Sequence, residues 1–537
     1  MKISFKNSSY LFLLILGLNM LFTSCTNDLD VTPKDDDEFL SETFFSDPNS
    51  YKEVLAKLYA GLYVGGNDGD ATADIAGIGG DFSSYLRLIF LMQEVTTDEA
   101  VIGWGDGTLP TLNTQTWSPN NEFLYGIFSR SYYEISTANE FLRQTTDDKL
   151  ASRGVSNELK AEIQYFRAEA RFLRAFSYVQ LMDLFGNVPI TTENDPVGFF
   201  YPQQKTRAEV FAYVESELKD LQTALKASKT NEYGRIDQTA AKFLLAQIYL
   251  NSKVYTGVEK NNETVTLCND IITTSGYTFA NVPYRYLFAA DNNRNGAQTE
   301  TIFPIVSDGL LIRATGAGMS FILHASIGGS MDASASGMDG GWWGLRTRKE
   351  FVQSFPDATA TADKRGTFYT NGQSLDINAI GSFTDGYAVT KYKNVNADGT
   401  AAQKNDIPDT DFPMFRLSDV YLMYAEATLR GGAGGNLTTA LGYINTIRAR
   451  ANATPIVIGS LNLDFILAER GRELFWECHR RTDLIRFGKF TGGDKLWQFK
   501  GGVQAGVATP AYRNLMPIPA TAIQANPTLK QNEGYVN

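Results

Sequence analysis

An apolar stripe at helical spacing, repeated along most of the chain, most constrains how this sequence can fold. The clearest stripe runs through residues 158–185, where apolar side chains return every three or four positions and so share one face of a helix. They are Ile163, Phe166, Ala170, Leu173 and Phe176. Gly186 and Pro189 follow and end the predicted helix. Such helices must bury their stripes against one another, so we expect a mainly α fold.

Two later stretches have the pattern of a helix, a turn and a second helix. The first covers residues 237–272 and breaks near Gly257, and the second covers residues 417–451 and breaks at the glycine-rich run 431–435. We expect about four such pairs, stacked as in tetratricopeptide repeats but without a clear period of about 34 residues. An unspecific helical bundle is the alternative.

Two helix starts carry capping signals. Thr206 and Glu209 have the spacing of a capping box, ahead of apolar positions that continue to Leu225. Ser118 followed by Pro119 predicts a helix whose first residue is the proline.

Residues 64–117 and 280–412 break the helical pattern, because they are rich in Gly, Asn, Asp and Thr and contain short strand-like runs such as 301–306. Long irregular segments in a compact protein are functional or disordered, and the many aromatic residues here argue against disorder. We therefore expect one domain over residues 46–537. Its helical scaffold covers about 46–63, 118–280 and 413–490, and its irregular, loop-rich lobe with short strands covers about 64–117 and 281–412.

The first residues have the pattern of an export signal. Lys2 and Lys6 precede an apolar run, residues 10–21, which is too short to span a bilayer, and small residues lead into Cys25. The pattern resembles a lipoprotein signal over residues 1–24 that leaves Cys25 as the lipidated, palmitate-bearing first residue; an ordinary secretory signal is the alternative. The acidic stretch that follows predicts a solvated tether over residues 25–45.

The charge and the scarcity of His and Cys exclude several classes of protein. The formal net charge is −12, whereas a protein that follows nucleic-acid phosphates needs a basic face, so we expect no nucleic-acid partner. The two histidines, His324 and His479, lie far apart, and the three cysteines form no Cys-x-x-Cys pair. This argues against a zinc site and against a disulfide framework.

Several segments, in order along the chain, resemble the RagB/SusD family. They are residues 167–176, 184–189, 412–427, 469–486, 517–519 and 526–535. Together with the lipoprotein signal they are distributed over most of the length of the chain. The resemblance implies a scaffold of tetratricopeptide-like helix pairs that carries an irregular ligand-binding lobe.

The resemblance also implies a surface-exposed lipoprotein of the outer membrane that works in glycan uptake. Such a protein binds oligosaccharides or polysaccharides without cleaving them and delivers them to a TonB-dependent, SusC-like transporter, on which it sits as a lid. The starch-binding branch of the family is the nearest match, so starch and malto-oligosaccharides are the expected ligands. Another neutral glycan such as a fructan is the alternative, followed by a glycoside hydrolase or a peptide-binding helical scaffold.

Two tryptophans lie in glycine-rich loops that are ill suited to bury them. Trp104 is in the run 103–107 and Trp342 in the run 340–344, which predicts two exposed aromatic platforms for sugar rings. The other tryptophans are expected to pack in the interior: Trp117, Trp343, Trp476 and Trp497.

The resemblance to starch-binding members adds Arg87, which matches an arginine that contacts sugar in those proteins. The alternative is that Arg87 forms a salt bridge with Glu94 or Asp98.

Two ligand-binding positions depart from those members. Thr315 falls where they have a third aromatic ring, for which Phe321 or Tyr387 could substitute. Their contacting asparagine falls on a glycine here, and the neighbouring Asp106 could replace its amide.

Acidic turns predict a structural calcium site. Asp409 and Asp411 are two residues apart in a proline-flanked loop, and Asp291 begins another oxygen-rich turn; hard oxygen donors of this kind suit Ca²⁺. The resemblance implies such a site on the matching Asp-x-Asp. A turn that caps the following helix is the alternative, and no other cofactor is expected.

No catalytic residue is expected. Glu473 and Glu477, beside Arg472 and Arg480, predict an ion-pair ladder on a helix surface. Cys478 and His479 are adjacent in sequence, and adjacent helix positions do not face each other, so they form no nucleophilic pair.

Overall fold

The computed structural model describes residues 41–67 and 72–536, and the chain divides into two compact units, Met1–Ser50 and Tyr51–Asn537. The predicted signal, the lipidation site Cys25 and most of the predicted tether lie outside the described residues. In the first unit, α2 spans Ser41–Phe44. Within the part of the chain that is described, no helix is both long enough and apolar enough to cross a membrane.

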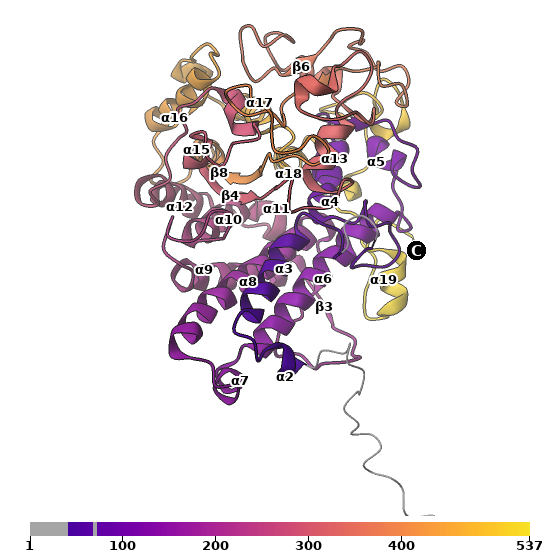
Figure 1. Ribbon diagram of the computed structural model, residues 1–537. Coiled ribbons are helices and arrows are strands. Elements are labelled where there is room, and N and C mark those ends of the chain that lie inside the picture. The colour runs from indigo at the N-terminus through magenta and orange to yellow at the C-terminus, as the bar shows by residue number, and fades with distance from the viewer. Residues whose placement is uncertain (1–40, 68–71, 537) are drawn as a thin grey trace, which may run out of the picture. The chain divides into compact units, whose positions relative to one another are not determined.

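The second unit is built on a succession of long helices, each packed against the next (Figure 1). In packing order they are α6 (Glu122–Gln144), α8 (Asn157–Phe185), α9 (Arg207–Ala224), α10 (Gln238–Leu250), α12 (Asn261–Thr274), α15 (Leu417–Leu429) and α16 (Leu437–Arg450). Helix α17 (Leu463–Leu474) packs against α15, and α3 spans Ser50–Gly61. The predicted mainly α fold with tetratricopeptide-like helix pairs is confirmed.

Helix α8 shows why the sequence pattern predicts this scaffold well. All five apolar residues of its predicted stripe are buried. The Oγ of Ser156 accepts a hydrogen bond from Leu159 N at the start, and Gly186, with φ +74°, ends the helix. The capping box predicted for α9 is also present, since Thr206 and Glu209 each satisfy the other's backbone amide.

The prediction that a helix begins at Pro119 is wrong. Helix α6 begins at Glu122, and its cap is Asn121, whose Oδ1 accepts hydrogen bonds from Phe123 N and Leu124 N. Asn121 also donates from Nδ2 to the carbonyl of Thr108, 3.2 Å away. The cap is therefore chosen by a contact with the irregular lobe, which a local signal does not contain.

Outside the long helices, two-stranded antiparallel ladders and short helical turns hold the lobe and the connecting segments. The ladders pair β1 (Val101–Ile102) with β5 (Leu345–Arg346), β2 (Val188–Pro189) with β3 (Gln204–Lys205), β4 (Thr301–Ile305) with β8 (Phe412–Arg416), and β6 (Phe368–Tyr369) with β7 (Ala388–Val389). The shorter α-helices are α4 (Tyr85–Phe90), α5 (Pro110–Thr114), α7 (Asp147–Ser152), α11 (Ser252–Thr256), α13 (Gly318–Ala325), α14 (Lys349–Val352), α18 (Arg480–Arg486) and α19 (Ala520–Ala525). A π-helix, η1 (Leu91–Val95), continues α4, and 3-10 turns include η2 (Tyr284–Phe288), η3 (Ala297–Thr299), η4 (Ala333–Ser336), η5 (Ile458–Ser460), η6 (Lys500–Gly502) and η7 (Ala511–Asn514).

The predicted surface ladder around Glu473 and Glu477 is wrong, because both side chains are fully buried. Helix α17 ends at Leu474, and Trp476 and Cys478 have positive φ, so the two glutamates do not share one helix face. They meet instead at Arg416 of β8, which lies 2.7 Å from Glu473 and 2.6 Å from Glu477.

This buried ion network joins the scaffold to the lobe. Arg416 also lies 3.2 Å from Glu300, just before β4, and Lys391 of the lobe lies 2.6 Å from Glu477. Arg365 of the lobe reaches Glu469 of α17 at 2.8 Å. Buried charges are tolerated only when paired in this way, so the network specifies which segments can meet.

We predict that Glu473→Gln lowers the free energy of unfolding by about 3–5 kcal/mol, because it leaves buried Arg416 and Arg450 short of a counter-charge. Urea unfolding followed by far-UV circular dichroism measures this. Glu140→Gln is the matched control: Glu140 pairs with Arg143 on the surface of α6 and is half exposed, so the expected loss is below about 1 kcal/mol. Equal losses in the two variants would contradict the prediction.

Candidate functional site

The β1–β5 ladder brings the two tryptophan loops together. Its register sets Val101 opposite Arg346, and Gly103 N donates to the Gly344 carbonyl at 2.9 Å. The residues that follow β1 and precede β5 are therefore neighbours. Nε1 of Trp104 donates to the carbonyl of Trp342 at 2.9 Å, and the two ring centroids are 6.3 Å apart.

A cavity of about 430 Å³ opens beside these rings. Its lining residues are Asp81, Phe82, Arg87, Trp104, Asp106, Thr315, Gly316 and Trp342. All five residues predicted to bind glycan lie here, drawn from four separate segments of the lobe. The sequence analysis did not single out Asp81, Phe82 or Gly316, although Phe82 is an aromatic residue two positions after the pair Gly79-Gly80 and so carries a signal similar to that of Trp104.

Arg87 forms the back of the cavity. It lies on α4, which packs against α6 and α13, and its side chain is buried. The guanidinium lies 4.1 Å from the ring centroid of Phe82, 4.3 Å from that of Phe321 and 5.7 Å from that of Trp104. Nη1 donates to the carbonyls of Gly316, at 2.8 Å, and Asp81, at 3.1 Å.

The alternative of a salt bridge from Arg87 to Asp98 is not what the structure shows. Asp98 pairs with Arg480 at 2.8 Å and with Lys495 at 3.0 Å, and Glu94 accepts from the backbone of His479. The guanidinium of Arg87 is therefore directed toward the cavity rather than into the ion network.

Trp342 rests on His324 of α13. The two rings stack with centroids 4.4 Å apart and planes 10° apart, and Trp342 N donates to the His324 carbonyl at 2.7 Å. Trp104 and Trp342 are half-buried rather than exposed as predicted, because each leans on a neighbouring ring. The prediction that Trp343 packs in the interior is wrong, because this residue is 54% exposed. Trp343 also does not line the cavity.

The expected substitutes for the missing third ring do not fill its place. Phe321 is fully buried behind Arg87, and Tyr387 is absent from the cavity lining. Asp106 and Thr315 lie at the exposed rim. The Trp104 loop is tied to α6, since Thr108 N donates to Glu122 Oε1 at 3.0 Å.

Arg346 stiffens the ladder beneath the cavity. Its guanidinium donates to the carbonyls of Gly344, at 2.9 Å, Asp385, at 2.8 Å, and Ile380, at 2.5 Å. Burial lowers the pKa of Arg346 to about 10, and neighbouring Asp385 offsets part of that shift. The side chain stays charged at neutral pH and ties its own strand to the loop that contains Ile380 and Asp385.

The acidic turns predicted to bind calcium do lie side by side, joined by Asn292, whose amide group exchanges hydrogen bonds with the Asp411 backbone. Each of the three carboxylates already accepts hydrogen bonds from the protein. Asp409 accepts from Gly309 N and Gln403. Asp411 accepts from Ser307 N and Tyr233, and Asp291 accepts from Asn295 and Ala397 N. Over residues 41–67 and 72–536 no group of three His, Cys, Asp or Glu side chains could hold a metal ion. The calcium site stays a prediction.

Two family models match the chain. One, described as the SusD family, matches residues 327–535, and the other, described as starch-binding and associating with the outer membrane, matches residues 40–250. The starch-binding protein SusD of Bacteroides thetaiotaomicron is 31% identical over the whole of both chains. The chain therefore belongs to the SusD family, as its motifs predict.

The chain is also similar to a further relative in sequence and to solved structures in fold. A SusD-like protein of Bacteroides ovatus is 24% identical, with 93% of this chain and 86% of that protein covered. A SusD superfamily structure from Bacteroides vulgatus gives a TM-score of 0.69 at 20% identity, covering 91% of this chain and 99% of that one. Surface glycan-binding protein A of Bacteroides thetaiotaomicron, solved with laminarihexaose, gives 0.65 at 20% identity, covering 90% and 98%.

We predict that Gly344→Ala displaces the Trp104 ring, because the added Cβ would lie 2.6 Å from Trp104 Cε2. The expected results are a shifted tryptophan emission spectrum and unchanged far-UV circular dichroism. Gly340→Ala is the control, since its Cβ would enter open space four residues earlier in the same loop. An unaltered spectrum for Gly344→Ala would show that the ring is not seated as described.

A second prediction concerns Asp411, whose pKa is raised to about 7 because burial outweighs its hydrogen bonds. A raised carboxyl pKa means that the folded state binds the proton more tightly than the unfolded state, so this group stabilises the fold below about pH 4 and loses that effect as pH rises to about 7. Relative to Asp411→Asn, the wild-type free energy of unfolding should fall between pH 4 and 7, which urea titrations at several pH values measure.

The predicted calcium site is tested by urea titrations at pH 7.5 in the presence of calcium or of a chelator. If calcium stabilises the wild type but not Asp411→Asn, the site is established.

Proposed function

We propose that this protein is a glycan-binding protein of the outer-membrane surface that captures oligosaccharides or polysaccharides without altering them, with starch and malto-oligosaccharides as the leading ligands. One observation carries the proposal: the cavity that joins Trp104, Trp342 and Arg87 offers aromatic rings and a cation in one open concavity. Sugar rings present apolar C–H faces and hydroxyl edges, which match these two kinds of surface.

The energetics favour weak, reversible capture. Each stacking contact contributes about 0.5–1.5 kcal/mol, by analogy with aromatic pairs, and two contacts leave little once the entropy of association is subtracted. Dissociation constants between about 1 mM and 1 μM follow. Such affinities suit a protein that must release its ligand to a transporter.

The preference for starch rests on the 31% identity to the starch-binding protein SusD. Thr315 at the rim, where a third ring is expected, weakens the case for that one ligand and keeps another neutral glycan, such as a fructan, as the rival. The structural neighbour solved with laminarihexaose adds β-glucan to the polymers worth testing.

The membrane location and the partner belong to the same proposal. A family described as associating with the outer membrane supports an anchor there, and the lipid would be attached at Cys25. The partner would be a SusC-like, TonB-dependent transporter that receives the glycan.

Catalysis has its own test, because two carboxylates, Asp81 and Asp106, line the cavity. We propose that they bind hydroxyls, in keeping with relatives that are named as binding proteins. Incubation with maltoheptaose should leave its length distribution unchanged; shortened products absent from the Asp81→Asn variant would identify a hydrolase.

We predict that Trp104→Ala and Trp342→Ala each weaken glycan binding about 3- to 10-fold, the loss expected for one stacking contact. Affinity electrophoresis in gels containing amylopectin, pullulan, levan, laminarin or xylan measures the effect and identifies the polymer. Trp343→Ala is the matched control, because this neighbouring indole is more exposed yet lies outside the cavity lining. Unchanged retardation of both test variants, with Trp343→Ala affected, would place the site elsewhere.

A further inference from the structure

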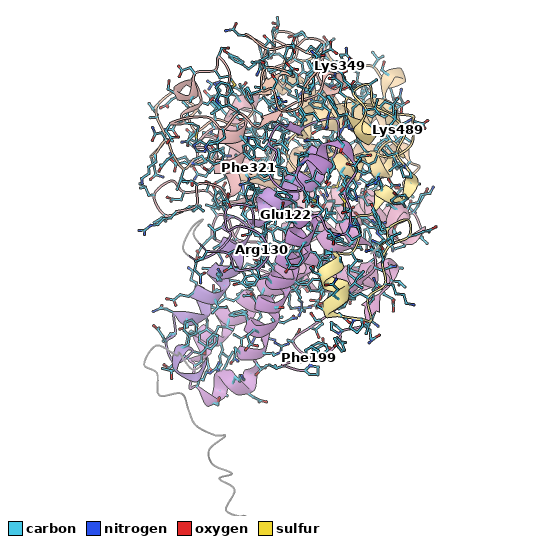
Figure 2. The ribbon with its side chains drawn as sticks, turned by 90° about the vertical axis from the view of Figure 1, so that its right-hand side faces the viewer. Glu122, Arg130, Phe199, Phe321, Lys349 and Lys489 are labelled. Carbon is cyan, nitrogen blue, oxygen red and sulfur yellow. The ribbon has the colours of Figure 1, made fainter. Side chains whose placement is uncertain are left out.

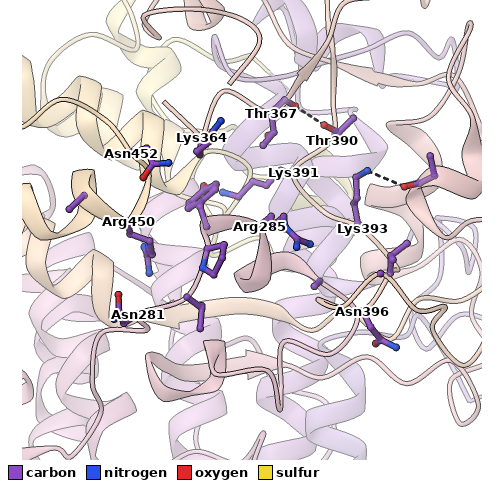
Figure 3. Close-up of a pocket in the computed structure, with 18 residues that line it drawn as sticks. Asn281, Arg285, Lys364, Thr367, Thr390, Lys391, Lys393, Asn396, Arg450 and Asn452 are labelled. Atoms are coloured by element: carbon purple, nitrogen blue, oxygen red, sulfur yellow. Dashed lines mark hydrogen bonds between the residues drawn. The ribbon is translucent and has the colours of Figure 1, made fainter. Parts of the chain in front are cut away.

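A second cavity, of about 810 Å³, lies between η2, the lobe segment 390–399 and the end of α16 (Figure 3). It shares no lining residue with the tryptophan cavity. Five of its lining residues are cationic, and none is acidic: Arg285, Lys364, Lys391, Lys393 and Arg450. The chain as a whole has 60 acidic and 48 basic residues, so a cavity wall with only cationic charged groups has a charge opposite to the net charge of the protein.

The floor of the cavity is electrically compensated. Lys391 lies 2.6 Å from Glu477, and Arg450 lies 2.6 Å from Glu300 and 2.5 Å from Glu473. These glutamates are fully buried on the far side of the two cations and do not line the cavity. The floor is therefore rigid and presents the cationic side of the ion network.

The rim is not compensated. Among the residues that the structure describes, no carboxylate lies within ion-pair distance of Arg285, Lys364 or Lys393. The two lysines donate only to backbone carbonyls, Lys364 to Ala360 at 2.9 Å and Lys393 to Ala335 at 3.0 Å. Burial, and to a smaller extent the charge of Arg285, lower the pKa of Lys393, and both side chains line the cavity (Figure 3).

Neutral hydrogen-bonding groups surround the cations. The lining includes the amides of Asn281, Asn396 and Asn452 and the hydroxyls of Thr367 and Thr390. At the wall, Thr367 Oγ1 and Asn396 Oδ1 are buried without a hydrogen-bond partner in the described part of the chain. Amides and hydroxyls suit a polyhydroxylated molecule, and uncompensated cations suit an oxyanion.

We propose that this cavity binds an acidic saccharide, whose carboxylate or sulfate group is held by Arg285 and Lys393 and whose hydroxyls are held by the asparagine and threonine side chains. An arginine accepts a planar oxyanion through two parallel hydrogen bonds, and the lysine adds a point charge. The volume lies within the range of small-molecule pockets. The site is separate from the tryptophan cavity and does not depend on the function proposed for it.

Isothermal titration calorimetry of the intact chain at low ionic strength tests this, with digalacturonate and a sulfated galactobiose as probes and neutral galactobiose and inorganic sulfate as references. At least one acidic disaccharide should bind, at least tenfold more tightly than either reference, and more weakly as salt is added. The double variant Arg285→Gln/Lys393→Gln should lose at least tenfold in affinity. Both side chains lie at the rim without ion pairs, so the variant is expected to fold.

Arg294→Gln is the matched control, since Arg294 is exposed, lies outside the lining and carries the same charge. Trp104→Ala is the second control and should leave acidic-saccharide binding unchanged while weakening neutral-glycan binding. Binding of neutral galactobiose as tight as that of the acidic probes, binding of inorganic sulfate alone, or no binding of any probe would overturn the proposal. Equal losses in Arg294→Gln and the double variant would also overturn it, because a general charge effect would then explain the binding.

Discussion

The contact between Arg416 and the buried glutamates of α17 and its following turn is the constraint on which the rest of the structure depends. Arg416 holds Glu473 and Glu477 inside the protein, and the turn after α17 is thereby placed against the lobe. Trp476 then donates to the carbonyl of Glu99, and His479 N to Glu94 on η1. Because η1 continues α4, which carries Arg87, the ion network reaches the tryptophan cavity through a short chain of contacts. Phe321, labelled in Figure 2, packs edge-to-face against Phe90 of α4, with ring centroids 6.0 Å apart.

The two cavities, both lined in part by the lobe, differ in the chemistry of their walls. The first pairs indole rings with one buried guanidinium, and this arrangement suits neutral sugar faces. The second is walled by cations, of which Lys391 and Arg450 are also the outer members of the ion network. A network that is neutral within the protein but ends in cations at a cavity can serve both folding and binding. The same charges then stabilise the junction and prepare a surface for an anion.

Local signals predicted the scaffold well. The stripe on α8, the capping box on α9 and the glycine break between α15 and α16 are all where the sequence indicates them, since each depends on residues within a few positions of one another. The glycine-rich loops also singled out Trp104 and Trp342 as aromatic platforms, and the structure places both in the lining of one cavity. Reasoning from spacing failed where a distant partner decided the outcome. Asn121 rather than Ser118 caps α6 because Thr108 of the lobe reaches it, and Glu477 is buried because Arg416 lies opposite.

The sequence by itself determined the helical scaffold, the family motifs and the residue types of the tryptophan cavity. Only the tertiary structure decided that Trp343 is exposed while Trp342 rests on His324, and that Arg87 faces the cavity while Asp98 pairs with Arg480. It alone also assembled the cationic cavity from segments more than 150 residues apart, such as those of Arg285 and Arg450. Periodicity and capping are encoded between near neighbours, whereas burial and charge pairing depend on which remote segments meet.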